Sequence, residues 1–297
     1  MKKVFSYLAI ILTLVISSMF ILNEIYSYSF RNGIVRNKRQ ELLLHKNDKF
    51  DILFLGSSRT ESHVVDSVFE NITNLKVINA GMERSTLHDS YAVFYSLLKN
   101  NNKLSECWIQ LDYTHNITKH SANMFAEIVP FLNDETLESH AIEIGQISSV
   151  RVPFTLFMKN DKPIGFREFF LKVINKKSEQ DFSLQFKPLL GCGTGLKGKW
   201  PKSMESNIAM NKILKLAKEY GIRVHFYTSP NCPKAENRDD FGFSLKENYR
   251  FKNYYDIFDD SLDYFYDCGH LNNKGALAFT KLLAEDFLRN KTCFSTQ

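Results

Sequence analysis

Short, nearly continuous apolar runs recur along the chain after residue 48, and each is followed by polar or turn residues. They occupy residues 50–55, 76–80, 107–111 and 223–228. Runs of this length are typical of strands that are buried on both faces of a parallel sheet. The pattern therefore predicts a buried parallel strand at each of these positions.

Between and after these runs, apolar residues recur at helical spacing. Helices are predicted over residues 87–98, 206–220 and 274–288, and Gly221 stands where a helix commonly stops. Strands that alternate with helices are joined by right-handed crossovers, which place helices on both faces of the sheet. The predicted fold class is α/β, a doubly wound three-layer αβα sandwich with a mostly parallel sheet. Sites in such folds lie at the carboxyl ends of the strands.

The N-terminal pattern is different, because residues 4–22 follow Lys2 and Lys3 without any charge. At about 1.5 Å per residue, a helix of this length nearly spans the roughly 30 Å hydrocarbon layer of a membrane. We therefore predict an uncleaved membrane anchor over residues 1–22. A cleaved signal peptide is the alternative, but the apolar region is long for one and no clear small-x-small cleavage site follows it.

The charges on the two sides of this anchor do not settle its orientation. Lys2 and Lys3 stand on one side, and the other side carries Arg31, Arg36, Lys38 and Arg39, so the positive-inside count does not favour a cytoplasmic N-terminus. We still expect the large domain outside the cytoplasm, because the anchor has a signal-like position and the candidate chemistry fits an envelope substrate.

The rest of the chain is expected to form a connector over residues 23–48 and one α/β domain over residues 49–297. An insertion at about 113–205 interrupts the domain, and we expect it to be partly helical and to cover the strand ends. Its Gly-rich segment, residues 191–199, lacks the Gly-Lys-Ser/Thr ending of a phosphate-binding P-loop. A flexible loop is the better interpretation of that segment.

The composition of the chain excludes several classes of protein and partner. The chain has 297 residues, 44% of them hydrophobic and 24% charged, which is typical of a globular protein rather than a disordered or polytopic one. The net charge of +5 is spread without a basic block, which argues against nucleic acid as a partner. None of the five cysteines forms a CxxC pair, so we expect neither a metal nor another cofactor.

Two segments could carry chemistry. Ser57 and Ser58 follow the first predicted strand, where a serine projects its hydroxyl from the sheet edge and its N–H can receive an oxyanion. Taken alone, helix capping explains these serines better. Near the other end, Asp267 precedes His270 by three residues, close enough to accept the imidazole Nδ1 proton and leave Nε2 as a base. Surface polar groups are the alternative there.

Together, the two segments resemble the SGNH/GDSL hydrolase superfamily, which has Gly-x-Ser after its first strand and Asp-x-x-His before its last helix. Gly56-Ser57-Ser58 and Asp267-Cys268-Gly269-His270 match these motifs in the same order, over residues 49–289 without the insertion. The resemblance implies a flavodoxin-like fold, with Ser58 as nucleophile, His270 as general base and Asp267 as its orienting acid. It also implies an oxyanion hole formed by the N–H groups of Ser58 and Gly81.

The chain departs from the family pattern in two places. Ser57 stands where the family often has Asp, a variant that resembles membrane-anchored members which decorate cell-envelope polymers. The third block, Gly-x-Asn-Asp, is not matched at residues 110–116. Asn116 could supply the missing amide donor, whereas an ionised Asp112 can only accept hydrogen bonds. Loss of one oxyanion donor costs about 2.7–4 kcal/mol, so slow or acceptor-selective chemistry is expected.

The resemblance and the predicted location imply a serine-dependent acyl ester hydrolase or O-acyltransferase, most simply for O-acetyl groups. Its substrate would be a cell-envelope polysaccharide or the acyl donor for one, and a membrane-bound acyltransferase is a conceivable partner. The alternative is a catalytically inactive membrane-anchored accessory or binding protein for polysaccharide assembly or export. The unmatched third block favours that alternative, and the Ser58, Asp267 and His270 set opposes it.

The remaining polar residues give weaker signals. Arg59 and Arg84 follow strand ends and could engage an anionic substrate, although solvated or helix-pairing arginines are at least as common. Four histidines have no metal-like spacing and are expected at the surface, namely His63, His88, His115 and His120. Cys232 and Cys268 should lie on loops at the same rim of the sheet, so we predict a disulfide between them in an oxidising compartment.

Overall fold

The structure is a computed structural model that describes residues 2–148, 162–178, 186–191 and 198–294. The chain forms two compact units. The N-terminal unit contains Met1–Gln40 and Ser121–Asp181, and the α/β unit contains Glu41–His120 and Phe182–Gln297. The segment expected to be one insertion at 113–205 is therefore divided between the two units. The expected Gly-rich loop lies largely outside the described residues.

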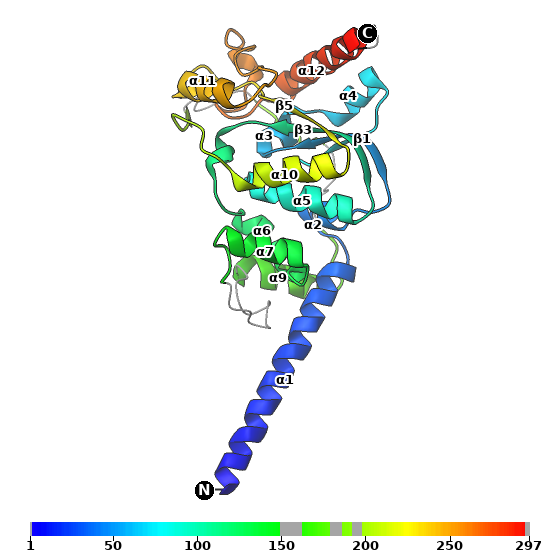
Figure 1. Cartoon of the computed structure of the whole chain (residues 1–297), viewed down its shortest axis with the longest axis vertical. Coiled ribbons are helices and arrows are strands. Elements are labelled where there is room, and N and C mark those ends of the chain that lie inside the picture. The colour runs from blue at the N-terminus through cyan, green and yellow to red at the C-terminus, as the bar shows by residue number, and fades with distance from the viewer. Residues whose placement is uncertain (1, 149–161, 179–185, 192–197, 295–297) are drawn as a thin grey trace. The chain divides into compact units, whose positions relative to one another are not determined.

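The α/β unit is built on a four-stranded parallel sheet with the order β2-β1-β3-β5 (Figure 1). The strands are β1 (Lys49–Leu55), β2 (Val77–Asn79), β3 (Lys103–Gln110) and β5 (Arg223–Tyr227). Each apolar run thus forms a parallel strand, as predicted, but β5, at the edge of the sheet, is only half-buried rather than buried. β3 begins before its apolar run because the polar residues from Lys103 onward pair with the start of β1.

The strand order brings two loops to one place. The chain leaves β1 for β2 on one side and returns for β3 on the other, so the order reverses between β1 and β3. In the register of this pair, Leu55 lies beside Ile109, near the carboxyl ends of both strands. The segments after these two strands therefore emerge together, which is where ligands commonly bind in parallel sheets.

Helices pack around the sheet in two groups. α5 (Leu87–Lys99) contacts α10 (Ile208–Glu219), whereas α12 (Asn273–Phe294) contacts α3 (Ser58–His63) and α4 (Asp66–Thr73). α5, α10 and α12 confirm the three predicted helices. The backbone of Gly221 has φ +66°, the left-handed conformation expected just after a helix end. The shorter elements of this unit are η1 (Tyr113–Asn116), β4 (Gly198–Lys199), β6 (Ala235–Glu236), α11 (Arg238–Asn248) and η3 (Leu262–Tyr264).

Aromatic side chains fill the core between the sheet and α4 and α12. The ring of Phe54 on β1 lies 5.3 Å from Phe69 of α4 and 6.0 Å from Trp108 of β3, and Trp108 lies 5.8 Å from Phe287 of α12. All four side chains are buried. Full burial of a large apolar side chain contributes about 1.5–3 kcal/mol, so this cluster firmly holds the strand that leads into Ser57 and Ser58.

The N-terminal unit is organised around α1 (Lys2–Asn32). This helix is long and apolar enough to cross a membrane, and its apolar window is not buried by the rest of the protein. It continues past the predicted anchor at 1–22, so the expected connector at 23–48 begins as helix and later includes α2 (Lys38–Leu44). The unit also contains α6 (Ala122–Ile128), η2 (Val129–Phe131), α7 (Glu135–Glu143) and α9 (Lys162–Val173), and α9 lies beside the C-terminal turns of α1 (Figure 1).

Candidate active site

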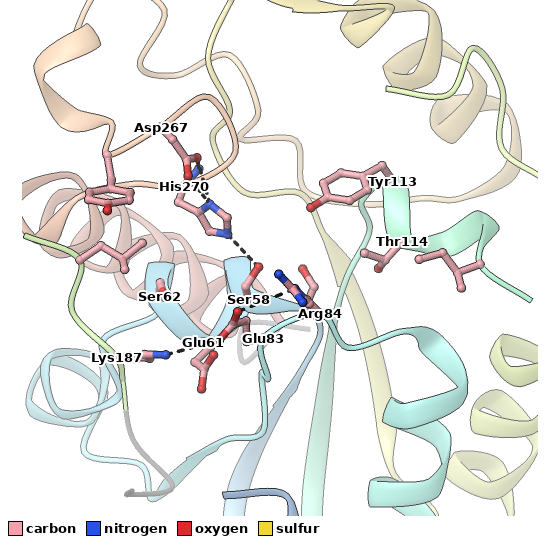
Figure 2. A pocket seen from close by; sticks show the side chains of 14 residues that line it. Ser58, Glu61, Ser62, Glu83, Arg84, Tyr113, Thr114, Lys187, Asp267 and His270 are labelled. Atoms are coloured by element: carbon pink, nitrogen blue, oxygen red, sulfur yellow. Dashed lines mark hydrogen bonds and ion pairs between the residues drawn. The ribbon is translucent and has the colours of Figure 1, made fainter. Parts of the chain in front are cut away.

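Residues from near the two ends of the α/β unit meet at one point. The Ser58 hydroxyl oxygen lies 2.7 Å from Nε2 of His270, and Nδ1 of the same ring lies 2.9 and 3.0 Å from the two carboxylate oxygens of Asp267 (Figure 2). The structure therefore brings together the three residues that the sequence motifs single out. This is the arrangement of a nucleophile, its base and the acid that orients the base.

The turn after β1 gives its two serines different tasks. Ser57 is the N-cap of α3, where its Oγ accepts a hydrogen bond from the Arg59 N–H and donates one to Asp112, 2.6 Å away. Ser58 is the first residue of the helix, and its hydroxyl points to His270 instead. Helix capping thus accounts for one serine and leaves the other available for chemistry.

Asp112, at the end of β3, holds this turn from the other side. Besides the Ser57 hydroxyl, the buried carboxylate accepts hydrogen bonds from the N–H and the hydroxyl of Thr114, at 2.8 and 2.6 Å. It acts as an acceptor toward all three donors, as expected for an ionised group. Asp112 therefore connects the carboxyl ends of β1 and β3.

The loop that carries the histidine is ordered by its own aspartate. Asp267 Oδ1 accepts hydrogen bonds from the N–H groups of Gly269 and His270, at 2.7 and 2.8 Å. Partial burial opposes ionisation of this carboxyl, but the hydrogen bonds from the His270 ring and from these N–H groups outweigh it and lower the pKa of Asp267 below its ordinary value. The lowered pKa favours the charged form of Asp267, which is the form that accepts the proton of His270 Nδ1 and orients the ring.

A disulfide between Cys232 and Cys268 fixes the same loop, as predicted. The two Cα atoms lie 4.8 Å apart, and the Cys232 N–H donates a hydrogen bond to the Cys268 carbonyl, 3.1 Å away. Cys268 directly follows Asp267 in the chain. The covalent link therefore ties the segment after β5 to the loop that presents Asp267 and His270.

The four histidines expected at the surface are all buried, and that expectation is wrong. His120 pairs with Asp89 at 2.8 Å, with the His88 ring edge-on to it, and Nε2 of His115 lies 3.2 Å from the Tyr249 hydroxyl. Burial lowers the pKa of His115 to about 4. Each ring is placed by tertiary packing, which the local sequence around it does not signal.

His63 is the buried histidine closest to the candidate chemistry. Its Nδ1 lies 3.0 Å from the Ser229 hydroxyl, and its Nε2 accepts a hydrogen bond from the Leu271 N–H. Burial, together with the nearby positive charge of Arg59, lowers the pKa of His63 well below its usual range. The ring is therefore neutral, with Nδ1 as donor and Nε2 as acceptor. No motif or spacing in the sequence predicts this support of the His270 loop.

Gly81, the expected oxyanion donor, has its N–H engaged in another hydrogen bond in this structure. Its N–H donates to Asn79 Oδ1, 3.0 Å away, and Gly81 is not among the residues that line the candidate pocket. A Cβ atom at Gly81 would come within 2.3 Å of the Glu61 backbone nitrogen. A glycine is needed here because the turn after β2 packs directly against the backbone of α3. The Asn79 amide strengthens this contact by donating to the carbonyls of Thr60 and Val64.

The amide of Asn116, the second expected donor, is also engaged elsewhere. Its Nδ2 donates to the Ser203 carbonyl at 2.8 Å, and its Oδ1 accepts from the Glu205 N–H at 3.0 Å. Both ends of the amide are therefore used to hold the segment at residues 203–205. Asn116, like Gly81, does not line the pocket.

The two candidate arginines have separate environments. Arg59 is fully buried, donates to the carbonyls of Ser229 and Pro230 at 2.6 and 2.9 Å, and lies 5.0 Å from the Trp200 ring. It therefore supports the site from behind and is not placed to bind substrate. Arg84 lines the pocket, its side chain is 81% exposed, and its backbone has φ +58°. Of the two, Arg84 is available to a ligand.

A pocket of about 600 Å³ opens in front of the Ser58 hydroxyl (Figure 2). The two ends of the segment expected at 113–205 contribute to its wall, through Tyr113, Thr114 and Ile117 on one side and Lys187 and Leu189 on the other. The remaining lining residues are Ser57, Ser58, Glu61, Ser62, Glu83, Arg84, Tyr266, Asp267 and His270. Aromatic, charged and hydroxyl groups therefore surround the Ser58 hydroxyl. Within the described residues, no group of His, Cys, Asp or Glu side chains is arranged to hold a metal ion.

In comparisons with known proteins, no family model and no curated protein matches the chain. The chemistry that this site can perform therefore has to be inferred from the geometry of its residues. A serine hydroxyl, a histidine that receives its hydrogen bond, and a carboxylate on the far side of that histidine can together transfer an acyl group.

Proposed function

We propose that the chain is a serine-dependent acyl ester hydrolase or O-acyltransferase of the SGNH type, acting most simply on O-acetyl groups. The hydrogen bond between Ser58 Oγ and His270 Nε2, with Asp267 behind the ring, carries this proposal. The side chains of Ser58, His270 and Asp267 all line one pocket. That convergence is what activation of a serine requires.

In the proposed mechanism, His270 Nε2 takes the proton of Ser58 while Oγ attacks the carbonyl carbon of an ester. The tetrahedral intermediate collapses as His270 returns the proton to the leaving alcohol, which leaves an acyl group on Ser58. Water or a sugar hydroxyl then gives its proton to His270 and attacks the acyl carbon, and His270 passes that proton to Ser58 Oγ as the acyl–serine bond breaks. Asp267 stabilises the imidazolium form in both halves of the reaction.

The developing oxyanion has one clear donor, the N–H of Ser58. This group lies in the first turn of α3, where backbone N–H groups have no partner within the helix. The buried guanidinium of Arg59 adds positive charge near the site, where it interacts with the charges of Asp112 and Asp267. Because the N–H of Gly81 and the amide of Asn116 are engaged elsewhere, we expect slow turnover, or turnover that depends on binding the right acceptor.

A cell-envelope polysaccharide, or the acyl donor that serves one, is the proposed substrate. An N-terminal helix apolar enough to cross a membrane would hold the site close to the envelope. The Cys232–Cys268 disulfide supports an oxidising compartment, and so a catalytic unit outside the cytoplasm. In the same setting, a membrane-bound acyltransferase could deliver the acyl group.

An SGNH-type three-layer sandwich is the proposed fold of the α/β unit. The sheet order β2-β1-β3-β5 corresponds to the flavodoxin-like order of doubly wound sheets. The pairing of α5 with α10, and of α12 with α3 and α4, supports helices on both faces.

A fluorophosphonate probe tests the proposed nucleophile directly. We expect the full-length protein in detergent to be labelled, and Ser58→Ala to abolish labelling. The matched control is Ser62→Ala, which alters a serine that lines the same pocket on the same helix and should leave labelling intact. Labelling of Ser58→Ala, or no labelling of the folded wild type, would rule out the seryl mechanism.

A catalytically inactive accessory protein for polysaccharide assembly or export is the second candidate. The observation that favours it is the engagement of both expected oxyanion donors, Gly81 and Asn116, in structural hydrogen bonds. Such a protein would retain polysaccharide binding in the pocket and would not react with the probe. Labelling at Ser58 would decide in favour of the enzyme.

A further inference from the structure

The last helix of the N-terminal unit has an apolar side that no described part of the protein covers. Phe170 and Val173 on α9, and Ile174 directly after its last residue, follow the i, i+3, i+4 spacing of one helical face and are 63, 53 and 51% exposed. We call these three residues the α9 stripe. Exposed apolar side chains that cluster in this way usually mark a contact with another protein or with a membrane.

Contacts within the same unit fix the level of α9 along α1. The neighbouring face of α9 packs on α1, where the ring of Phe169 lies 5.5 Å from Tyr26 and the Lys172 ammonium lies 5.2 Å from the Phe30 ring. Lys172 also donates to the carbonyl of Ile34, 2.6 Å away. These contacts are with the turns of α1 that come after its charge-free run and with the residues just beyond them.

That level corresponds to the edge of a bilayer. If residues 4–22 fill the hydrocarbon layer, a rise of about 1.5 Å per residue places Tyr26 and Phe30 about 6 and 12 Å beyond it. Interfacial helices lie with their apolar face about 5–10 Å into the headgroup and acyl boundary. Tyr28 on α1, which is 67% exposed, also has the position of an aromatic belt residue, whereas Tyr26 is buried against Phe169. The α9 stripe therefore lies at the depth where a lipid interface would meet it.

The charges around the α9 stripe also favour contact with a lipid interface. The described part of α9 and the residues just after it present Arg167, Lys176 and Lys177 at the surface. The acidic residue of this segment, Glu168, lies 2.9 Å from the Arg36 guanidinium and 3.9 Å from that of Arg167. An apolar stripe flanked by basic side chains is typical of helices that bind anionic membrane surfaces.

We propose that α9 is an interfacial helix, whose stripe inserts Phe170, Val173 and Ile174 into the lipid interface beside α1 while the flanking basic residues meet anionic headgroups. The N-terminal unit then has two membrane contacts, one spanning and one lying in the interface. Because α9 is fixed to α1 by the Lys172 and Phe169 contacts, the second contact restricts rotation of the unit about the anchor. This inference depends on α1 being in the membrane and is independent of the chemistry at Ser58.

A tryptophan placed in the stripe provides a direct test in the full-length protein. Phe170→Trp and the control Phe243→Trp would be reconstituted in nanodiscs that contain phosphatidylglycerol, with and without lipids spin-labelled near the headgroup end of the acyl chain. Phe243 lies on α11 in the α/β unit and is 65% exposed, which matches Phe170 closely. The signal of the native, buried Trp108 and Trp200 is subtracted with the parent protein.

We expect spin-labelled lipid to quench the Phe170→Trp emission at least twofold more than the Phe243→Trp emission, with a shift to shorter wavelength. Replacing phosphatidylglycerol by phosphatidylcholine should reduce this quenching, and Lys176→Gln with Lys177→Gln should reduce it in the anionic discs. Equal lipid quenching at the two positions would overturn the proposal. Shielding of Phe170→Trp from both lipid and aqueous acrylamide would also overturn it, because a protein surface would then cover the stripe.

Discussion

The backbone N–H of Leu271 donates a hydrogen bond to the Nε2 atom of His63, 2.9 Å away. Leu271 directly follows the proposed base His270, so a buried histidine on α3 holds the backbone of a second histidine on a distant loop. The other nitrogen of His63 lies 3.0 Å from the Ser229 hydroxyl, which fixes the neutral ring in one tautomer. α3 therefore presents Ser58 at one end and, through His63 at the other, holds the backbone next to the proposed base His270.

Replacing His63 by Phe should separate these two functions of α3. The variant leaves the buried Leu271 N–H without an acceptor, which costs about 1–3 kcal/mol of stability. We expect the rate of fluorophosphonate labelling at Ser58 to fall about 10- to 100-fold, as is typical when a partner that orients an active group is lost.

The pH profile of labelling distinguishes positioning from a general loss of structure. A misplaced His270 should shift the midpoint of the profile in the Phe variant. His63→Gln, which can still accept a hydrogen bond, should recover part of the rate and of the profile. Wild-type labelling kinetics in His63→Phe would show that Leu271 needs no such support.

Stability should fall as the pH drops below about 6.5, because His63 and His115 are neutral in the fold. Burial lowers the pKa of both groups, that of His115 to about 4. Between the folded pKa and the unfolded value near 6.5, the unfolded chain binds a proton that the folded chain does not, so the free energy of unfolding decreases with decreasing pH. Each histidine contributes up to about 1.4 kcal/mol per pH unit in that range.

Denaturant unfolding of the solubilised protein at pH 7.5, 6.5, 5.5 and 5.0 measures this slope. The carboxylates are common to wild type and variant, so His63→Gln should differ from the wild type only by losing the contribution of His63. Parallel curves for the two proteins over this range would mean that His63 binds protons in the fold as readily as in the unfolded chain, contrary to the neutral ring described above.

The sheet and the meeting of Ser58, Asp267 and His270 could be predicted from sequence because their signals are local. Buried parallel strands need continuous apolar runs, and residues 50–55 carry one that ends in Gly56. The Asp267 and His270 pair needs only a short loop, and its spacing is visible in the chain. A residue placed directly after a parallel strand lies at the carboxyl end of the sheet, where sites form in such folds. The predicted order of elements therefore already placed Ser58 at that end of the sheet, where the Asp267 and His270 pair was also expected.

Other features depend on contacts between distant segments and have no local signal. Gly81 follows a strand like a potential oxyanion donor, yet its N–H is used by Asn79, two residues earlier in the chain. Asn116 has the right chemistry for a donor, but both ends of its amide face residues 203–205. His63 gives no periodic or motif signal at all. Tertiary packing decided each of these cases.

Reduction of the Cys232–Cys268 disulfide should lower both stability and reactivity. The bond closes a loop with a sequence separation of 36 residues, and a loop of that size restricts the unfolded chain by about 3–4 kcal/mol. The bond also fixes Cys268, which lies between Asp267 and His270 in the chain. We expect Cys232→Ser with Cys268→Ser to unfold at lower denaturant concentration and to label more slowly at Ser58.

A reductant provides the internal control for this prediction. Reduced wild type should resemble the double variant, and the double variant should not respond to the reductant. Cys107 is buried and not disulfide-bonded, so Cys107→Ala should keep the full response. A reductant effect of equal size in the double variant would assign it to another group.

Gly81→Ala tests whether the turn after β2 acts by packing or by donating a hydrogen bond. The added Cβ would lie 2.3 Å from the Glu61 nitrogen and 2.8 Å from the Thr60 carbonyl carbon. Both are backbone atoms of α3, so α3 or the turn has to move, at a cost typical of overpacking, about 1–3 kcal/mol. The N–H of residue 81 is retained, so an oxyanion donor at this position would survive the substitution. We therefore expect reduced stability together with slower labelling of Ser58, because the helix that carries the nucleophile is displaced.

Asn79→Ala is the matched variant, because it releases the N–H of Gly81 without adding an atom. The change also removes the hydrogen bonds that the Asn79 amide donates to the carbonyls of Thr60 and Val64. It should therefore destabilise the protein without accelerating the reaction at Ser58. Faster fluorophosphonate labelling in Asn79→Ala would instead indicate that the freed N–H can join the oxyanion hole.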